Sequence, residues 1–255
     1  MLFNSYIFIF VFLPLAIGSY YGLHKLKKPV LAKVSLILMS FWFYGYFNPS
    51  YLWIMCSSIL VNYLLSQLLQ RKWLFAPERI SLLKKTLLGI GLIFNLGLIF
   101  YFKYYDFFVD NLNKVFSADF QLRHVVLPLG ISFFTFQQVS YMVDSYRGET
   151  KEYNFADYAL FVTFFPQLIA GPIVTHDELI PQIKDENRQR PDYGNLSKGL
   201  MIFAAGMFKK VIIADTFGGI ADWGFEDIAA MSSIDRKSTR LNSSHTRPSR
   251  MPSSA

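Results

Sequence analysis

The sequence opens with MLFNSYIFIFVFLPLAIGSYYGL (residues 1–23), which contains no Asp, Glu, Lys, Arg or His. An α-helix needs about 20 mostly apolar residues to cross the hydrocarbon core of a bilayer. A secretory signal peptide carries basic residues before its apolar run and a small-residue cleavage site after it, and neither occurs before Tyr20. The run therefore predicts a first membrane helix that is retained in the protein.

Four further windows without charged residues follow. They lie between Lys33 and Arg71, Lys85 and Lys103, His124 and Asp144, and Asp157 and His176. Only 17% of the chain is charged, whereas soluble domains carry about 25% charged residues. A chain of 255 residues cannot bury five such windows in one soluble core. We therefore expect an all-α, polytopic transmembrane fold with about six or seven membrane segments, some of them broken or re-entrant.

The expected membrane segments are 3–22, 30–47, 51–69, 86–102, 125–143, 158–173 and 199–214. Loops 24–33 and 71–85 are strongly basic, which indicates that both face the cytoplasm. The N-terminus and the turn at Asn48-Pro49 are then extracytoplasmic. Residues 103–124 balance three basic with three acidic side chains, so we expect an external loop there.

The stretch LPLGISFFTFQQVSYMVDSYRGE (127–149) is too polar for a helix that faces only lipid. On a helix Gln137, Tyr141 and Asp144 fall on one side. Polar groups at membrane depth are costly unless they face protein or a water-filled cavity. Two interpretations of Gln137 and Gln138 stay open, namely the lining of a substrate passage and hydrogen bonding between helices. Asp144 lies near the expected helix end, where a solvated loop also accounts for it.

The stretch FFPQLIAGPIVTHDEL (164–179) gives the strongest indication of a functional interior. Pro166 and Pro172 each remove a backbone donor and break a helix. Gly171 permits backbone conformations that other residues rarely adopt. Broken backbone at membrane depth is tolerated only where it is buried in protein or lines a cavity. The alternative interpretation is a kinked structural helix.

No catalytic set of residues is visible in the sequence. There is no phosphate-binding G-x-x-x-x-G-K-[ST] loop, no H-E-x-x-H and no G-x-S-x-G. Cys56 is the single cysteine, so a disulfide within the chain and a Cys-based metal site are excluded, and we expect no metal site. Lys209 and Lys210 interrupt an apolar run, where they either extend to the membrane surface or bind an anionic group.

Six sequence blocks occur in a fixed order. They are FNSYIFIFVFLPLAIGSYYGL (3–23), FYGYFNPSYLWIM (43–55), FKYYDFFVDNLN (102–113), LPLGISFFTFQQVSYMVDSYRGE (127–149), FPQLIAGPIVTHDELIPQI (165–183) and GMFKKVIIAD (206–215). Together they resemble the membrane-bound O-acyltransferase family, and within it the members that acetylate alginate. The resemblance covers about residues 3–225.

The resemblance implies a multi-pass acyltransferase of the bacterial inner membrane that acylates a polysaccharide. Members transfer an acyl group, often acetyl, from a cytoplasmic donor to a hydroxyl. The donor is acetyl-CoA or a carrier-delivered acyl group, no cofactor is bound, and the implied partners are periplasmic acetyltransferases or an acyl carrier. The acceptor hydroxyl must lose a proton, and in the family a His in a W-H-G-type segment is taken as the base. That segment lies downstream of block 206–215, so no residue here is assigned as catalytic.

The family's tunnel-wall motif matches this chain at Phe165, Pro166, Gln167, Gly171, Pro172 and His176. Gln137 and Asp144 match the preceding helix, where Gln138 is a further candidate. These residues are the predicted lining of a substrate tunnel. His176 alone among the histidines follows a broken segment, which is weak support for a direct catalytic role.

The resemblance also implies a domain organisation. Residues 1–225 form the N-terminal part of the acyltransferase domain, and 226–235 are a truncated connection. Residues 236–255, RKSTRLNSSHTRPSRMPSSA, hold five basic residues and no acid. This composition predicts a disordered tail, and the string resembles translated sequencing-adapter read-through, so we expect it to be non-native. Since the tail supplies most of the net charge of +7, the charge does not indicate a nucleic-acid partner.

Without the downstream His, a chain of these residues alone is expected to be inactive. Two alternative functions stay open. One is the related D-alanyl-transfer protein of teichoic acid modification. The other is a membrane transporter or scaffold without enzymatic activity, since transporters also build their sites from broken helices.

Overall fold

The computed structural model describes residues 1–70, 80–151, 153–168, 171 and 174–226. All regular elements in these ranges are helices, which confirms the predicted all-α fold class. The chain divides into two compact units, Met1–Pro191 and Asp192–Ala255, and each is described by itself. The expected connection beyond Glu226 and the tail 236–255 lie outside the described residues.

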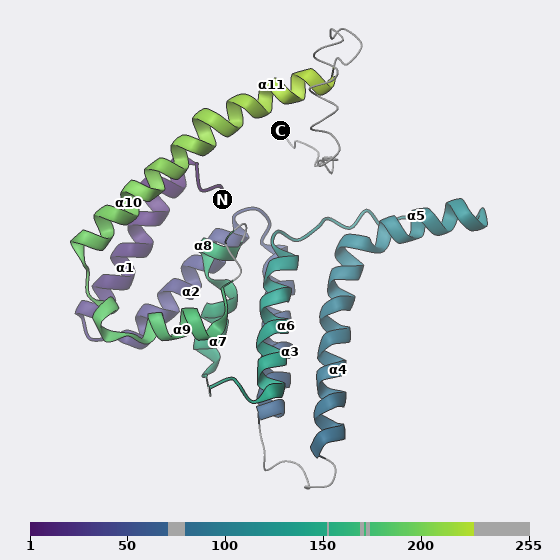
Figure 1. Ribbon diagram of the computed structural model, residues 1–255, viewed down its shortest axis with the longest axis horizontal. Coiled ribbons are helices and arrows are strands. Elements are labelled where there is room, and N and C mark those ends of the chain that lie inside the picture. The colour runs from purple at the N-terminus through teal and green to yellow at the C-terminus, as the bar shows by residue number, and fades with distance from the viewer. Residues whose placement is uncertain (71–79, 152, 169–170, 172–173, 227–255) are drawn as a thin grey trace. The chain divides into compact units, whose positions relative to one another are not determined.

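The first unit contains twelve described helical segments, labelled in Figure 1 where there is room. In chain order they are η1 (Phe8–Phe12), α1 (Leu13–Lys25), α2 (Pro29–Gly45), α3 (Ser50–Gln70), α4 (Ile80–Ile99), η3 (Phe100–Tyr104), α5 (Tyr105–Phe116), α6 (Ile131–Arg147), α7 (Phe155–Thr163), α8 (Phe165–Leu168), α9 (His176–Lys184) and η4 (Glu186–Gln189). Segments η1 and η3 are π-helical, and η4 is a 3-10 turn.

Three helical stretches are long and apolar enough to cross a membrane. They are Phe8–Lys25, Ser50–Gln70 and Leu82–Phe116, and the shorter apolar helix Pro29–Gly45 lies between the first two. The stretches Phe8–Lys25, Ser50–Gln70 and Pro29–Gly45 overlap the predicted segments 3–22, 51–69 and 30–47. The stretch Leu82–Phe116 contains the predicted segment 86–102 but extends well beyond its end. The charge-free windows therefore located the apolar helices correctly.

Two local signals define the turns between these helices. Pro29 is the first residue of α2, where its missing N–H is not needed. The Asn48 side-chain oxygen accepts a hydrogen bond of 3.0 Å from the Ser50 amide and starts α3. In Figure 1 the α1–α2 turn lies at the left, at the lower ends of α1 and α2, and the α2–α3 turn lies at the upper ends of α2 and α3.

The predicted external loop over residues 103–124 is wrong for its first part. The helix continues from α4 through η3 into α5, which Figure 1 shows turned away from α4. The charges that suggested a loop stand one helical turn apart, and Lys114 pairs with Asp110 at 2.6 Å. Phe108 and Val115 are exposed seven positions apart on one side of this helix, so α5 carries an exposed apolar face.

Helix α6 begins at Ile131, six positions after the start predicted for segment 125–143. Gly130 precedes it with a φ of 70° in the left-handed region, a conformation that favours glycine. A Cβ atom at this position would collide with the carbonyl oxygen of Leu168. The α6 start is therefore fixed by a close approach to α8.

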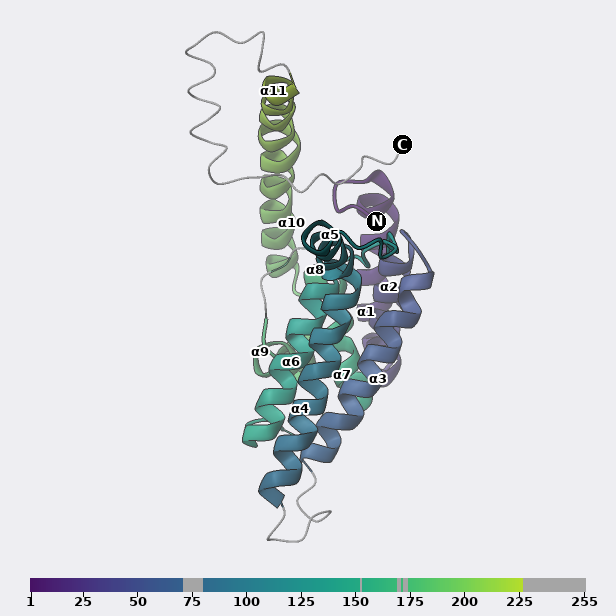
Figure 2. The same cartoon turned by 90° about the vertical axis from the view of Figure 1, so that its right-hand side faces the viewer.

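Helices α3, α4 and α6 pack against one another, as Figures 1 and 2 show. Their interface contains a buried amide cluster in which Asn62 and Asn95 exchange side-chain hydrogen bonds. Ser58 and Asn62 both donate to the Gln138 side-chain oxygen. The remaining buried core mixes aliphatic with aromatic side chains, and its aromatic members include Tyr44, Phe134, Tyr141, Tyr158 and Phe161.

The second unit is helical throughout its described part. It consists of α10 (Tyr193–Phe208), the π-helical η5 (Lys209–Ala214) and α11 (Asp215–Glu226). The Asp192 side chain accepts from the amides of Gly194 and Asn195 and so caps α10. Lys209 and Lys210 lie in η5, and Lys210 is ion-paired with Asp215.

Candidate functional site

His176 of α9, which is buried, pairs with Asp144 of α6, which is partly exposed. The His176 Nε2 atom lies 3.2 Å from the Asp144 Oδ2 atom. His176 is the first residue of α9, and only 4% of its surface is exposed. Asp144 Oδ2 also accepts a hydrogen bond of 3.5 Å from the Ser140 hydroxyl. The structure therefore brings two of the predicted tunnel residues into direct contact.

Aromatic rings surround the His176 imidazole on three sides. The ring centroids of Tyr141, Tyr153 and Phe161 lie 5.2, 5.8 and 6.3 Å from that of His176. Within the described part of the chain the buried Nδ1 atom has no hydrogen-bond partner. Because the Asp144 carboxylate lies against Nε2, a neutral imidazole that carries its proton on that nitrogen offers a lone pair at Nδ1. Such a group can accept a proton or orient a bound hydroxyl.

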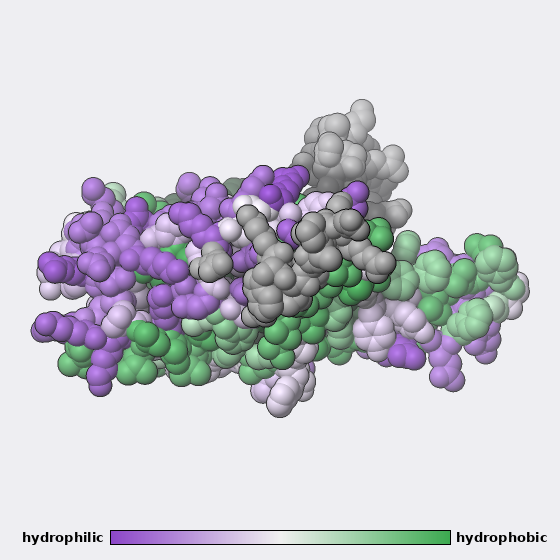
Figure 3. Space-filling view, turned by 90° about the horizontal axis from the view of Figure 1, so that it is seen from below, coloured by the Kyte–Doolittle hydropathy of each residue, from purple (hydrophilic) through white to green (hydrophobic). Residues whose placement is uncertain are grey.

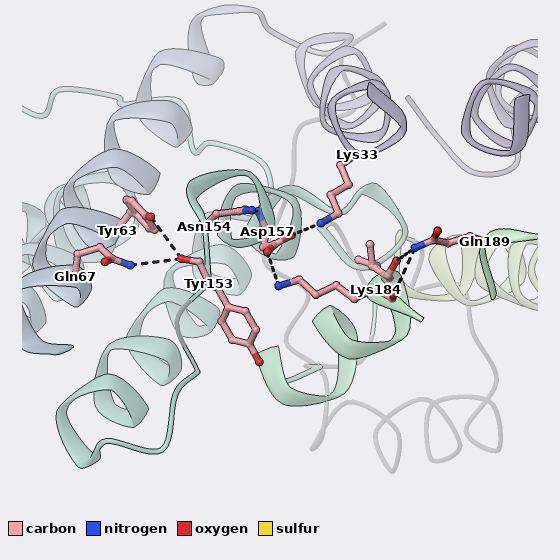
Figure 4. Close-up of polar contacts among 9 residues, drawn as sticks. Lys33, Tyr63, Gln67, Tyr153, Asn154, Asp157, Lys184 and Gln189 are labelled. Atoms are coloured by element: carbon pink, nitrogen blue, oxygen red, sulfur yellow. Dashed lines mark hydrogen bonds and ion pairs between the residues drawn. The ribbon is translucent and has the colours of Figure 1, made fainter. Parts of the chain in front are cut away.

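Asp157 is the centre of a second polar cluster, drawn in Figure 4. Lys33 from α2 and Lys184 from α9 each lie 2.7 Å from its carboxylate. Asn154 caps α7 by accepting from the Asp157 amide at 2.8 Å. Burial alone would raise the pKa of the Asp157 carboxyl, but the hydrogen bonds from Lys184 and Lys33 hold it below its usual value.

The segment before α7 is bound to α3. The Tyr153 carbonyl accepts from the Tyr63 hydroxyl at 3.4 Å and from the Gln67 amide at 3.5 Å, as Figure 4 shows. The Lys184 ammonium also lies 5.0 Å from the centre of the Tyr153 ring. The ring of Tyr153 in turn packs against His176. These contacts connect the Asp157 cluster to the surroundings of the His176–Asp144 pair.

Sequence reasoning did not single out this cluster. Lys33 and Asp157 appeared only as the limits of charge-free windows, and Lys184 was not considered. A charge that directly borders an apolar window is expected to sit near a membrane surface or a partner. The positions of Lys33 and Asp157 at the borders of apolar windows were therefore a usable signal. The sequence does not predict, however, that α2, α7 and α9 lie together, so it could not predict the ion pairs among them.

The two glutamines of α6 are both buried, at 4% and 0% exposure for Gln137 and Gln138. The Gln138 oxygen is occupied by Ser58 and Asn62 of α3, whereas its amide nitrogen has no partner in the described residues. Hydrogen bonding between helices therefore accounts for the Gln138 oxygen. That Gln137 and Gln138 line a substrate tunnel stays a prediction.

The predicted membrane segment 158–173 is not one helix. Helix α7 ends at Thr163, and Phe164 leaves the helical region with a ψ of 106°. Pro166 then lies in the first turn of α8, where its missing N–H is tolerated. The broken backbone that the two prolines predicted is present at the first of them, and Pro172 lies outside the described residues.

Phe165 and Gln167 anchor this break in protein. The Phe165 ring packs edge-on against Phe12 with centroids 5.0 Å apart. The Gln167 amide donates to the Phe161 carbonyl at 2.9 Å, one helical turn before the break. A Cβ atom at Gly171 would lie 2.5 Å from the Gln167 Cα atom, which explains a glycine at that position. Pro166 is exposed, in contrast to its two neighbours.

No group of three or more His, Cys, Asp or Glu side chains that could hold a metal ion occurs in the described residues. The site therefore consists of an oriented imidazole, a lysine-paired carboxylate and an irregular backbone segment. Together these groups can handle protons and hold a polar ligand.

The sequence was compared with known proteins. Residues 36–237 match the model of the MBOAT, membrane-bound O-acyltransferase, family. The chain is 40% identical over 268 aligned positions to a peptidoglycan O-acetyltransferase of Helicobacter pylori, covering 95% of this chain and 50% of the relative. It is 34% identical to a probable alginate O-acetylase of Pseudomonas aeruginosa, covering 88% of this chain and 42% of the relative. A similar protein of Pseudomonas putida is 36% identical, with 88% and 45% covered. The chain thus spans about half the length of these relatives, and no solved structure matches it.

Proposed function

This chain belongs to the membrane-bound O-acyltransferase family, and we propose that it forms the N-terminal part of an enzyme that acetylates hydroxyls of an exported polysaccharide. Two of the relatives are named for acetylating peptidoglycan and alginate. Both polymers are glycans, so the proposed acceptor is a sugar hydroxyl. The higher identity to the peptidoglycan enzyme favours a cell-wall glycan over alginate as the polymer to test first.

One observation carries the chemical part of the proposal. The broken segment between α7 and α9 ends at His176, whose imidazole lies against Asp144 and whose Nδ1 atom has no partner among the described residues. A polar, irregular segment of this kind suits the wall of an acceptor passage. His176 is proposed as a positioning residue, because the family's catalytic base is expected downstream of block 206–215.

The remaining features of the enzyme follow as parts of the same proposal. The protein crosses the bacterial inner membrane several times with its N-terminus outside. The acyl donor is acetyl-CoA or a carrier-delivered acyl group, and the partners are periplasmic acetyltransferases or an acyl carrier. Residues 1–225 form part of the transferase domain, and these residues alone transfer no acyl group.

Acyl transfer can be tested with the complete gene product. The full reading frame would be expressed in a bacterium whose own glycan acetylation gene has been deleted. Ester-bound acetate is then measured by mass spectrometry on purified peptidoglycan and on exported polysaccharide. Acetate on either glycan supports the proposal and identifies the acceptor.

Two results would contradict the proposal. One is a membrane-inserted protein that leaves both glycans unacetylated while teichoic acid gains D-alanine. The other is accumulation of a solute in membrane vesicles without any acyl transfer, which a transporter would give. Expression of residues 1–225 alone serves as the inactive control.

A further inference from the structure

A pocket of about 580 Å³ lies where the α1–α2 turn meets η4 and the residues after it. His24, Lys25 and Lys27 contribute from the turn, and Glu186, Gln189 and Arg190 from the other side. The two segments are far apart in sequence, so the pocket is created by the fold of the first unit. It is separate from the His176–Asp144 pair, because none of its lining residues belongs to that site.

The pocket carries an excess of positive charge. Lys25, Lys27 and Arg190 face the single carboxylate of Glu186. In the described ranges none of these three cations has an ion-pair partner, whereas the neighbouring Arg188 lies 3.6 Å from Asp185. The cations of the pocket are therefore available to an anionic ligand.

His24 lines the pocket with its ring held edge-on against Tyr20, with centroids 4.6 Å apart. The Nε2 atom of His24 is buried and has no hydrogen bond to any described residue. Because that atom is covered, the charged ends of the lining lysines and of Arg190 are the groups that an occupant of the pocket would meet.

The backbone of the turn brings the cations together. The amides of Leu26, Lys27 and Lys28 bond to the carbonyls of Gly22, His24 and Leu23 and close the end of α1. Lys27 adopts a φ of 56°, the left-handed conformation in which glycine is usual. A lysine at this position adds a charge at the mouth of the pocket that glycine would not supply.

The position in the membrane suggests the ligand. The candidate span Phe8–Lys25 ends within the pocket lining, which places the pocket at the boundary between hydrocarbon and water. Figure 3 views the first unit from its lower end, where hydrophilic side chains gather beside broad hydrophobic areas. Phosphate groups of lipids, and of soluble phosphorylated molecules, are the anions met at this depth.

We propose that this pocket binds a phosphoryl group, carried either by a phospholipid headgroup or by a soluble phosphorylated ligand. Arg190 matches phosphate with two parallel N–H donors, and the two lysines add charge. Binding of a phosphoryl group in this pocket does not depend on the proposed acyltransferase function.

Two probes distinguish the sources of the phosphoryl group. The full chain in phosphatidylcholine nanodiscs is titrated with inorganic phosphate and followed by phosphorus NMR line broadening. The same chain in mild detergent is examined by native mass spectrometry with added phosphatidylglycerol. Saturable binding of phosphate identifies a soluble ligand, and retention of phosphatidylglycerol alone identifies a headgroup. Either outcome supports the proposal, and binding of neither probe overturns it.

A matched pair of variants tests the pocket itself. Lys25→Gln with Arg190→Gln removes two pocket charges and should weaken binding roughly tenfold or more, since hydrogen bonds to charged groups are lost. Lys28→Gln with Arg188→Gln removes two neighbouring charges that do not line the pocket, so binding should change less than about twofold. All four side chains are exposed, and circular dichroism verifies that the helices are retained. Equal weakening by both pairs would mean a general surface potential and would overturn the proposal.

Discussion

Lys33 of α2 lies 2.7 Å from the carboxylate of Asp157 in α7, a contact that spans 124 positions of the chain. Lys184 of α9 reaches the other oxygen of the same carboxylate. Asp157 is buried, with 2% of its side chain exposed. A single carboxylate therefore links α2, α7 and α9.

Asp157→Ala should lower stability strongly. The substitution leaves the partly buried Lys33 without its counter-charge, and breaking such a pair costs about 3 kcal/mol. Lys184→Ala should cost less than about 1 kcal/mol, because 43% of that side chain is exposed to water. The thermal unfolding midpoint in detergent is the measurement, with the surface pair variant Lys114→Ala as control. Equal midpoints for Asp157→Ala and Lys114→Ala would show that the cluster does not hold the helices.

The contribution of Asp157 should depend on pH in one direction. Its pKa in the folded protein is lowered, because the bonds from the two lysines outweigh the opposing effect of burial. A lowered pKa stabilises the fold above the ordinary Asp value of about 4, and this stabilisation is lost as the pH falls through the folded pKa. The difference in unfolding midpoint between the wild type and Asp157→Asn should be large at neutral pH and should shrink in acid. A difference that stays constant down to about pH 2 would contradict this account.

Gly130→Ala should destabilise the start of α6. The new methyl group meets the Leu168 carbonyl oxygen, and the residue is forced to a φ of 70°. We expect a loss of about 2 kcal/mol from strain and collision together. Gly148→Ala is the matched control, since its φ of 79° is similar but no atom lies within 4 Å of the added carbon. A similar loss of stability in both variants would mean that the left-handed backbone conformation alone, and not the collision with Leu168, causes the effect.

Asp144→Asn should reduce acyl transfer by the complete enzyme. The change replaces a charge-assisted hydrogen bond to His176 with a neutral one, which is about half as strong. We expect kcat to fall roughly tenfold with KM little changed while the fold is retained, because a positioning residue acts mainly in the transition state. Asp110→Asn, which removes an exposed carboxylate of α5, should leave both kcat and KM unchanged. An unaltered kcat in Asp144→Asn would leave the pair a purely structural role.

The sequence predicted the positions of the helices better than it predicted which residues contact one another. Charge-free windows identified the apolar helices, and the Pro166 signal identified the break after α7. The start of α6 was misplaced because apolarity continues back to Val125, whereas the helix begins only after the left-handed Gly130. The loop predicted over residues 103–124 was wrong for 103–116, which are helical, because balanced charges are equally compatible with an i, i+4 pair on a helix.

The sequence by itself determined that this chain is helical and apolar enough for a membrane, and its ordered motifs determined the family. Apolarity and helix breaking depend on neighbouring residues, so they can be read along the chain. Only the tertiary structure decided that Asp144 faces His176, that two lysines share Asp157, and that the α1–α2 turn meets η4 in a basic pocket. Those pairings join segments far apart in sequence, and their partners are selected by the packing of whole helices rather than by local pattern.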